Sequence, residues 1–308
     1  MVVDIPKVAI GIDIGGTNIK VGLVDRTGAV LDQFTLKTAE YPTPRPLADD
    51  LSAQIEELAE NYALLGIGIG APNGNFYRGS IEHPPNLAWE GVTPFASWMA
   101  EATGVPCFLT NDANAAALGE MLFGAAKGMS DFLFITLGTG LGSGIVVGGK
   151  LVYGHDGTAG EIGHVIVEPG GRPCGCGRRG CLEQYASATG VVITYRELNP
   201  DASPDTTSRG ISERAASGEQ AALDAFEQTA KVLGLALANS VAYTQPEAIF
   251  LFGGLAAAGD LLFEPVRRHF EANLLNIYQG KTTILPSGLS ESDAAILGAA
   301  SLIWQQQL

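Results

Sequence analysis

The sequence has few cysteines, few basic residues and no long uninterrupted apolar run. Its 308 residues include only 18 Lys and Arg against 33 Asp and Glu, so the formal net charge is −15. This acidic balance, without a cluster of basic residues, argues against binding nucleic acid or an anionic membrane surface. Residues 1–7 lack the charged segment, apolar stretch and cleavage site of a signal peptide. We therefore expect a soluble, cytoplasmic protein with no membrane or nucleic-acid partner.

The sparse cysteines also exclude a disulfide framework. Cys107 stands alone, whereas Cys174, Cys176 and Cys181 lie within eight residues. Three clustered thiols and one distant thiol do not form a set of paired bridges in a chain of this length. The cluster instead indicates a reducing compartment and a metal site.

Glycine, in contrast, is abundant. The chain contains 40 glycines, about 13% of its residues, where roughly 7% is usual. They show no G-X-Y period, which excludes collagen, and a hydrophobic content of 46% argues against general disorder. Fifteen of the 40 glycines lie between Gly138 and Gly180. The length exceeds that of a single core, so two domains are expected.

Two segments of the chain share a pattern of strand, glycine-rich turn and strand. The first comprises apolar strands at residues 7–13 and 18–24, with a third strand at 29–36. The second comprises strands at 132–137 and 143–147. This weak internal duplication predicts two related domains. Chance similarity between two glycine-rich hairpins is the alternative.

The remaining patterns interleave strands and helices, which predicts an α/β protein. Short buried strands are expected at residues 64–70, 107–110 and 248–252. Helical periodicity is found at residues 47–62, 113–123, 219–243, 256–278 and 294–304.

The turn Gly138–Gly144 can bind an anion but matches no standard nucleotide motif. It lacks the third glycine and the following helix of the dinucleotide-binding fingerprint, and the chain has no P-loop. A hairpin tip of Gly and Thr can still present backbone N–H groups to a phosphate, because glycine lets the backbone approach closely. A tight turn without a ligand is the alternative.

Two further segments suit a nucleotide. In Asp13–Lys20, the Asp13 carboxylate could hold hydrated Mg²⁺, and a Thr hydroxyl and a Lys follow it. Gly253 and Gly254, after a buried strand, could admit a flat adenosine against the backbone. The alternatives are a plain hairpin turn and a strand-to-helix connection.

Asp112 is the candidate for acid–base chemistry. It follows an apolar strand and directly precedes a helix. A carboxylate within hydrogen-bond reach of an alcohol can act as its general base. However, Asn111-Asp112 also has the pattern of a helix N-cap, which lowers the pKa of a carboxylate, so capping is the alternative.

A stronger pattern predicts a metal centre. His164 is followed by Cys174, Cys176 and Cys181, and one His with three Cys forms a closed tetrahedral zinc set, typical of structural sites. Arg178 and Arg179 could offset the charge of the thiolates. Reduced free thiols in a loop are the alternative. A redox role is less favoured, since the pair is C-x-C rather than C-x-x-C.

Two glutamates flank this set. Glu161 precedes His164 by three residues, and Glu183 follows Cys181 by two. The second ring nitrogen of a metal-bound His can serve a ligand, so zinc would hold in place a polar rim of Glu161, His164 and Glu183 that suits sugar hydroxyls. Ordinary supporting or solvated roles for both glutamates are the alternative.

Together these motifs resemble the ROK family (repressors, open reading frames and sugar kinases) of the actin-like ATPase superfamily. The matching segments, in order, are Asp13–Lys20, Pro85-Asn86, Asn111-Asp112, Gly138–Gly142, Gly160–His164, Cys174–Glu183 and Gly253-Gly254. The segment Pro72–Phe76 departs from the commoner Pro-Gly type, which leaves the exact sugar open.

The resemblance implies two actin-like domains with an interdomain cleft. The small domain would span residues 1–112 plus 294–308, and the large domain, with the zinc loop, residues 113–293. It also implies an ATP-dependent hexose kinase, most like the glucokinases, with ATP, Mg²⁺ and structural Zn²⁺. Two copies of the chain are expected to form a homodimer.

The resemblance assigns roles residue by residue. Asp112 would be the catalytic base on the sugar 6-hydroxyl, and it would also contact the sugar. The other sugar-binding residues would be Asn86, Asn111, Glu161, His164 and Glu183. The nucleotide would be bound by Asp13, Gly15, Gly16, Thr17, Lys20, Gly138, Thr139, Gly140, Gly253 and Gly254. Zinc would be bound by His164, Cys174, Cys176 and Cys181.

Kinases for N-acetylmannosamine, N-acetylglucosamine, fructose or allose share nearly the same rim, so they are alternatives to a glucokinase. A sugar-responsive regulator is an alternative from another class. The regulators of this family carry an additional N-terminal DNA-binding segment, for which we expect no room before the strand that begins by Val8, and the charge of −15 disfavours DNA.

Overall fold

A computed structural model describes residues 5–307, so the first four residues of the segment considered as a signal peptide lie outside it. The chain forms two compact units. The first comprises the chain up to Gly128, Leu151–Ala159 and the segment from Gly288; the second comprises Met129–Lys150 and Gly160–Ser287. The domain boundaries expected after residue 112 and before residue 294 remain a prediction.

The first unit is built on a five-stranded sheet of order β3-β2-β1-β4-β8. The strands β1 (Lys7–Ile14), β2 (Asn18–Asp25) and β3 (Val30–Lys37) form the predicted antiparallel meander. β4 (Ala63–Ala71) and β8 (Cys107–Asn111) continue the sheet in parallel with β1. The buried apolar residues of β1 and β4 explain why these strands occupy the centre.

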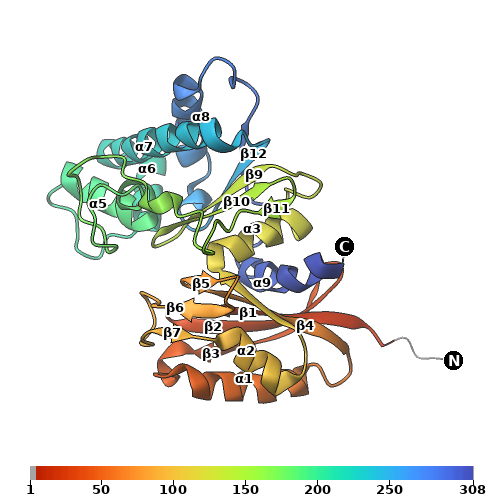
Figure 1. The fold of residues 1–308 in the computed structure, drawn as a ribbon. Coiled ribbons are helices and arrows are strands. Elements are labelled where there is room, and N and C mark those ends of the chain that lie inside the picture. The colour runs from red at the N-terminus through yellow and green to blue at the C-terminus, as the bar shows by residue number, and fades with distance from the viewer. Residues whose placement is uncertain (1–4, 308) are drawn as a thin grey trace. The chain divides into compact units, whose positions relative to one another are not determined.

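Helices cover both faces of this sheet (Figure 1). One face carries α1 (Pro44–Leu58) and α2 (Phe95–Thr103), and the other carries α3 (Asp112–Phe123) and α9 (Ala294–Trp304). Helix α9 lies directly on the sheet backbone, since a Cβ on Gly68 would overlap the carbonyl oxygen of Ala299. A small sheet of β5 (Gly74–Asn75), β6 (Ser80–Glu82) and β7 (Val92–Thr93) completes the unit.

The second unit repeats this strand order. Its sheet runs β11-β10-β9-β12-β13, so the hairpin β9–β10 corresponds to β1–β2, and β12 to β4. The strands are β9 (Phe132–Leu137), β10 (Leu141–Val147), β11 (Lys150–Leu151), β12 (Ala248–Phe252) and β13 (Thr283–Pro286). The common order supports the duplication expected from the two glycine-rich hairpins.

Five α-helices accompany this sheet: α4 (Glu183–Ala186), α5 (Ala188–Leu198), α6 (Ser208–Ala216), α7 (Gln220–Thr244) and α8 (Asp260–Asn273). Apolar residues of β9 and of helices α5 to α8 form one core cluster. No helix between residues 5 and 307 is both long and apolar enough to span a membrane.

The expected helix over residues 256–278 was wrong at both ends. Gly259, with a φ of 61°, separates a short 3₁₀ turn (Ala256–Ala258) from α8. The helix then ends at Asn273, and the apolar residues beyond it do not continue a buried face, since Leu275 and Ile277 are exposed. Helices α2, α4, α5 and α6 were not predicted.

The close packing of α9 predicts a large effect of one methyl group. Gly68→Ala should lower the free energy of unfolding by about 3 kcal/mol, because the blocking atom is a backbone oxygen held in a helix. Gly22→Ala is the matched control, since its Cβ would lie 2.5 Å from Cγ2 of Ile296, a side chain that can shift. Urea unfolding measures both variants, and equal losses would contradict this explanation.

Candidate functional site

The acidic candidates of the first unit meet at the carboxyl ends of three parallel strands. Asp13 in β1 pairs with Gly70 in β4, and Gly70 pairs with Thr110 in β8. A Cβ on Gly70 would lie 3.6 Å from Cα of Asp112 and 3.9 Å from Oδ1 of Asp13. The strand register therefore brings together two carboxylates that are 99 positions apart in the chain.

Asn111, and not Asp112, is the N-cap of α3. Its Oδ1 accepts hydrogen bonds from the backbone N–H groups of Ala113 at 2.8 Å and Asn114 at 3.4 Å. Asp112 is the first helical residue, and its Oδ1 accepts from Ala113 N at 2.7 Å. The capping role left open for Asp112 thus belongs to its neighbour, and the hydrogen bond of Asp112 to Ala113 N involves only Oδ1.

Burial and mutual repulsion make these carboxyl groups hard to ionise. Burial, with Asp112 nearby, raises the pKa of Asp13 to about 7, although Lys20 opposes the rise. Burial also raises the pKa of Asp112. Such a pair favours a cation, which offsets two negative charges at once.

The first glycine turn lies beside this pair. Asp13 is paired across the hairpin with Lys20, and Gly15 N donates to Asn18 O at 3.0 Å. A Cβ on Gly16 would lie 2.9 Å from the carbonyl oxygen of Asn86, so this position must be glycine for the two segments to touch. The unit therefore gathers the predicted nucleotide residues of the first turn with Asn86, Asn111 and Asp112.

The second glycine turn is held by the segment that begins α4 and α5. Ala188 N donates to Gly138 O and Thr189 Oγ1 to Thr139 O, both at 2.8 Å. Leu141 N donates to Oε2 of Glu183 at 3.0 Å. The turn Gly138-Thr139-Gly140 is therefore fixed by side-chain and backbone groups far along the chain.

Gly253 lies next to this turn. Its strand, β12, is the parallel neighbour of β9, so both glycine segments follow the carboxyl ends of adjacent strands. Gly253 has a φ of 101°, and a Cβ there would lie 2.9 Å from Leu137 O. Carboxyl ends of parallel strands are the usual place for ligands in open α/β sheets.

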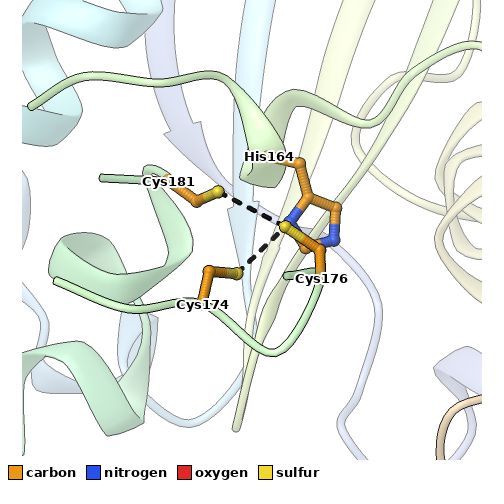
Figure 2. Close-up of side chains that lie close together, drawn as sticks. All are labelled: His164, Cys174, Cys176 and Cys181. Carbon is orange, nitrogen blue, oxygen red and sulfur yellow. Dashed lines mark hydrogen bonds between the residues drawn. The ribbon is translucent and has the colours of Figure 1, made fainter. Parts of the chain in front are cut away.

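The predicted zinc ligands converge in the second unit (Figure 2). One donor atom from each of the four residues lies within 4.8 Å of every other. Cys174 Sγ is 3.7 Å from Nδ1 of His164, and Cys176 Sγ is 3.6 Å from Cys181 Sγ. Ligands at about 2.3 Å from a tetrahedral ion are separated by roughly 3.8 Å, so this donor set fits zinc.

Three arginines make hydrogen bonds that hold the zinc loop. The Arg178 guanidinium donates to His164 O at 2.7 Å, and hydrogen bonds from Arg178 lower the pKa of the Cys176 thiol to about 6. Arg179 instead donates to Gly170 O. Arg172, which no sequence pattern singled out, donates to Gln184 O at 2.7 Å and to Thr194 Oγ1 at 2.9 Å. It attaches the loop to α4 and α5.

The two rim glutamates lie in different settings. Glu161 is exposed and directly precedes a 3₁₀ turn, Ile162–His164. Glu183 is partly buried, is the first residue of α4, and contacts the second glycine turn. The candidate residues thus form two groups, one in each unit.

Two α/β units with one strand order, each with a glycine-rich turn after its first strand, define an actin-like protein with two related domains. The ROK family model matches residues 9–306, and the chain belongs to this family.

Relatives and a solved structure agree. The chain is 35% identical to a glucokinase of Halalkalibacterium halodurans, over 97% of this chain and 95% of the relative. It is 33% identical to an N-acetylmannosamine kinase of Escherichia coli, over 97% and 99%. The crystal structure of a ROK family glucokinase from Streptomyces griseus with glucose and AMPPNP is 36% identical, with a TM-score of 0.81 and coverage of 97% and 99%.

The four-donor cluster predicts about one zinc ion per chain. Cys176→Ser should lose the metal, because serine replaces a thiolate ligand with a poorly acidic hydroxyl. Cys107→Ser, which changes the cysteine of β8 outside the cluster, should retain it. Elemental analysis of the purified variants measures the zinc content. Metal-free wild-type protein with full activity would contradict the assignment.

The raised pKa of Asp13 predicts a dependence of stability on pH. Between its unfolded value of 3.8 and about 7, the folded protein binds more protons than the unfolded chain, so stability falls as pH rises. Asp13→Asn should reduce this fall, whereas Asp32→Asn, an exposed change in β3, should not. Urea unfolding of the ligand-free protein at pH 5 and pH 7.5 tests this, and identical slopes in all three proteins would refute it.

Proposed function

We propose that this ATP-dependent sugar kinase is a glucokinase, which transfers the γ-phosphoryl group of ATP to the 6-hydroxyl of glucose. One observation carries the proposal. Asn111 is the N-cap of α3, and Asp112, the next residue, lies beside Asp13 at the carboxyl ends of β1, β4 and β8. Relatives at 35% identity are glucokinases, which supports glucose as the acceptor.

In this proposal Asp112 is the general base. As the hydroxyl oxygen forms its bond to the γ-phosphorus and the bond to the β–γ bridging oxygen breaks, the carboxylate takes the hydroxyl proton and ADP leaves. The raised pKa of Asp112 favours this, because a more basic carboxylate binds the proton more tightly. Positioning and electrostatic stabilisation supply most of the rate in phosphoryl transfer.

The glycine turns would hold the nucleotide. The carbonyl groups of Gly138 and Thr139 are engaged by α5, so the N–H groups of this turn are the donors for a phosphate. Asp13, with its raised pKa, would hold hydrated Mg²⁺, which neutralises phosphate charge when bound. Thr17 and Lys20 would complete the first turn, and Gly253 and Gly254 would face the adenosine.

The sugar hydroxyls would be bound by Asn86, Asn111, Glu161, His164 and Glu183. Nδ1 of His164 faces Cys174 in the zinc cluster, which leaves Nε2 for a hydroxyl. Zinc would thus orient a sugar-binding imidazole while taking no part in the transfer. Association of two copies into a homodimer and a cytoplasmic location remain predictions.

A coupled assay for ADP across a panel of hexoses tests the function. Glucose should give the highest kcat/KM. N-acetylmannosamine is the main alternative acceptor in the panel, since a kinase for that sugar is also a relative. The panel is run with ATP and with polyphosphate as donors. Absence of ADP formation with every hexose would refute a kinase and favour a sugar-sensing regulator.

Asp112→Asn tests the base. The amide should retain glucose binding but lose turnover by about 10³-fold or more, because it cannot accept the proton. Glucose affinity, measured by calorimetry, serves as the internal control for folding. Asp32→Asn should keep wild-type kcat. Near-normal turnover of Asp112→Asn would exclude the assigned role.

A further inference from the structure

The two carboxylate oxygens of Glu183 have different partners. Oε2 accepts a hydrogen bond from Leu141 N at 3.0 Å, and a Cβ on Gly140 would overlap this same oxygen. Within residues 5–307, the hydrogen-bond contacts of Oε1 are long ones, with Gln184 Nε2 at 3.4 Å and Cys174 Sγ at 3.9 Å. One oxygen is therefore committed to the second glycine turn, and the other retains capacity to accept a hydrogen bond from a ligand.

This hydrogen bond lies where the turn passes into β10. Leu141 is the first residue of β10, directly after Gly138-Thr139-Gly140, and it stands opposite Leu137 in β9. Its N–H goes to Glu183, while the next N–H, of Gly142, goes to Oγ1 of Thr136 at 3.0 Å. Two side chains, those of Glu183 and Thr136, therefore accept the first two backbone N–H groups after the turn.

The small residue at position 140 belongs to the same arrangement. Because Gly140 has no Cβ, the carboxylate can lie directly against the backbone of the turn. The carbonyl groups of the preceding two residues are held from α5, immediately after α4 in the chain. Glu183 at the start of α4 and residues 188–189 at the start of α5 thus hold the turn from both ends.

We propose that Glu183 is a positioning residue for the nucleotide turn, in addition to any contact it makes with the sugar. Oε2 keeps the backbone at Gly140–Leu141 in the conformation that receives a phosphate. Oε1 is the oxygen that accepts a sugar hydroxyl. This inference rests on the proposed kinase function only for the identity of the two ligands.

A direct consequence is that sugar binding and nucleotide binding are coupled within the second unit. A hydroxyl bound to Oε1 restricts the rotation of the carboxylate and so keeps Oε2 on Leu141 N–H. By linkage, glucose should then tighten nucleotide binding by the same factor by which the nucleotide tightens glucose binding. A residue that contacts the sugar alone would have no effect on nucleotide binding in the absence of sugar.

The test compares Glu183→Ala, Glu183→Gln and the wild-type protein, with AMPPNP and Mg²⁺ as the probe and no sugar present. Glu183→Ala should raise the Kd for AMPPNP about tenfold, the loss expected for one hydrogen bond to a charged group. Glu183→Gln should remain within about threefold, because its amide oxygen can still accept from Leu141 N–H. Amide exchange of residues 137–142 in the free protein should be faster in Glu183→Ala only.

Glu197→Ala is the matched control. This exposed carboxylate pairs with Arg172, so its removal also affects the support of the zinc loop, but it lies outside the contacts of the turn. Its AMPPNP affinity and turn exchange should match the wild type. The zinc content of each variant shows whether an effect arises from loss of metal.

A second test combines Gly140→Ala with Glu183→Ala and measures AMPPNP affinity in the two single variants and in the double variant. Its Cβ displaces the carboxylate, so its cost to AMPPNP binding should shrink about fivefold or more when Glu183 is already alanine. The inference is overturned if Glu183→Ala, with zinc retained, leaves AMPPNP affinity and turn exchange unchanged, or if the two substitutions are additive. These measurements need no turnover. If the protein phosphorylated no hexose, the proposed function would be refuted, and AMPPNP affinity and amide exchange would still test the role of Glu183.

Discussion

The parallel register of β1, β4 and β8 is the constraint on which the candidate chemistry depends. Carboxyl ends of parallel strands lie at one edge of a sheet, so Asp13, Gly70 and the residues after Thr110 must meet there. Backbone hydrogen bonding thus places two acidic groups together, at the cost of a raised pKa for Asp13. That unfavourable ionisation is what a bound cation and a transferred proton would relieve. The second sheet has the same order, so its glycine segments also meet at one edge, after β9 and β12.

The high glycine content follows from close approach of backbone segments. Gly68 admits α9 onto the sheet, Gly16 admits the segment of Asn86, and Gly140 admits the carboxylate of Glu183. None of these three has a φ in the left-handed region. Glycine is needed at each position because a Cβ would contact a neighbouring atom too closely. The glycines therefore let side chains and helices approach the backbone closely, at both glycine turns and on the first sheet, and they do not indicate disorder.

The zinc loop shows a different solution to holding side chains in place. Residues 165–182 contain no helix or extended strand, and their backbone hydrogen bonds, such as Val167 N to Gly180 O and Gly180 N to Arg172 O, are isolated ones. Hydrogen bonds from Arg178 and Arg172 add to these, and the four predicted zinc ligands would add metal coordination. Glu183 begins the next helix and connects this loop to the glycine turn through Leu141. Residues 174–183 therefore carry three predicted zinc ligands and one predicted sugar-binding residue, Glu183, which contacts the predicted nucleotide turn.

The sequence by itself determined the α/β class, the paired hairpins, α3, α9 and the four residues of the His and Cys cluster, whose binding of zinc remains a prediction. These features depend on local periodicity and spacing, such as the helix predicted and found at residues 294–304. Only the tertiary structure decided that Asn111 caps α3, that α8 ends at Asn273 and that Glu183 binds Leu141 N–H. Each of these depends on which backbone group lies opposite a side chain, or on whether an apolar residue finds a buried surface. Such contacts join residues far apart in the chain, and no local pattern contains them.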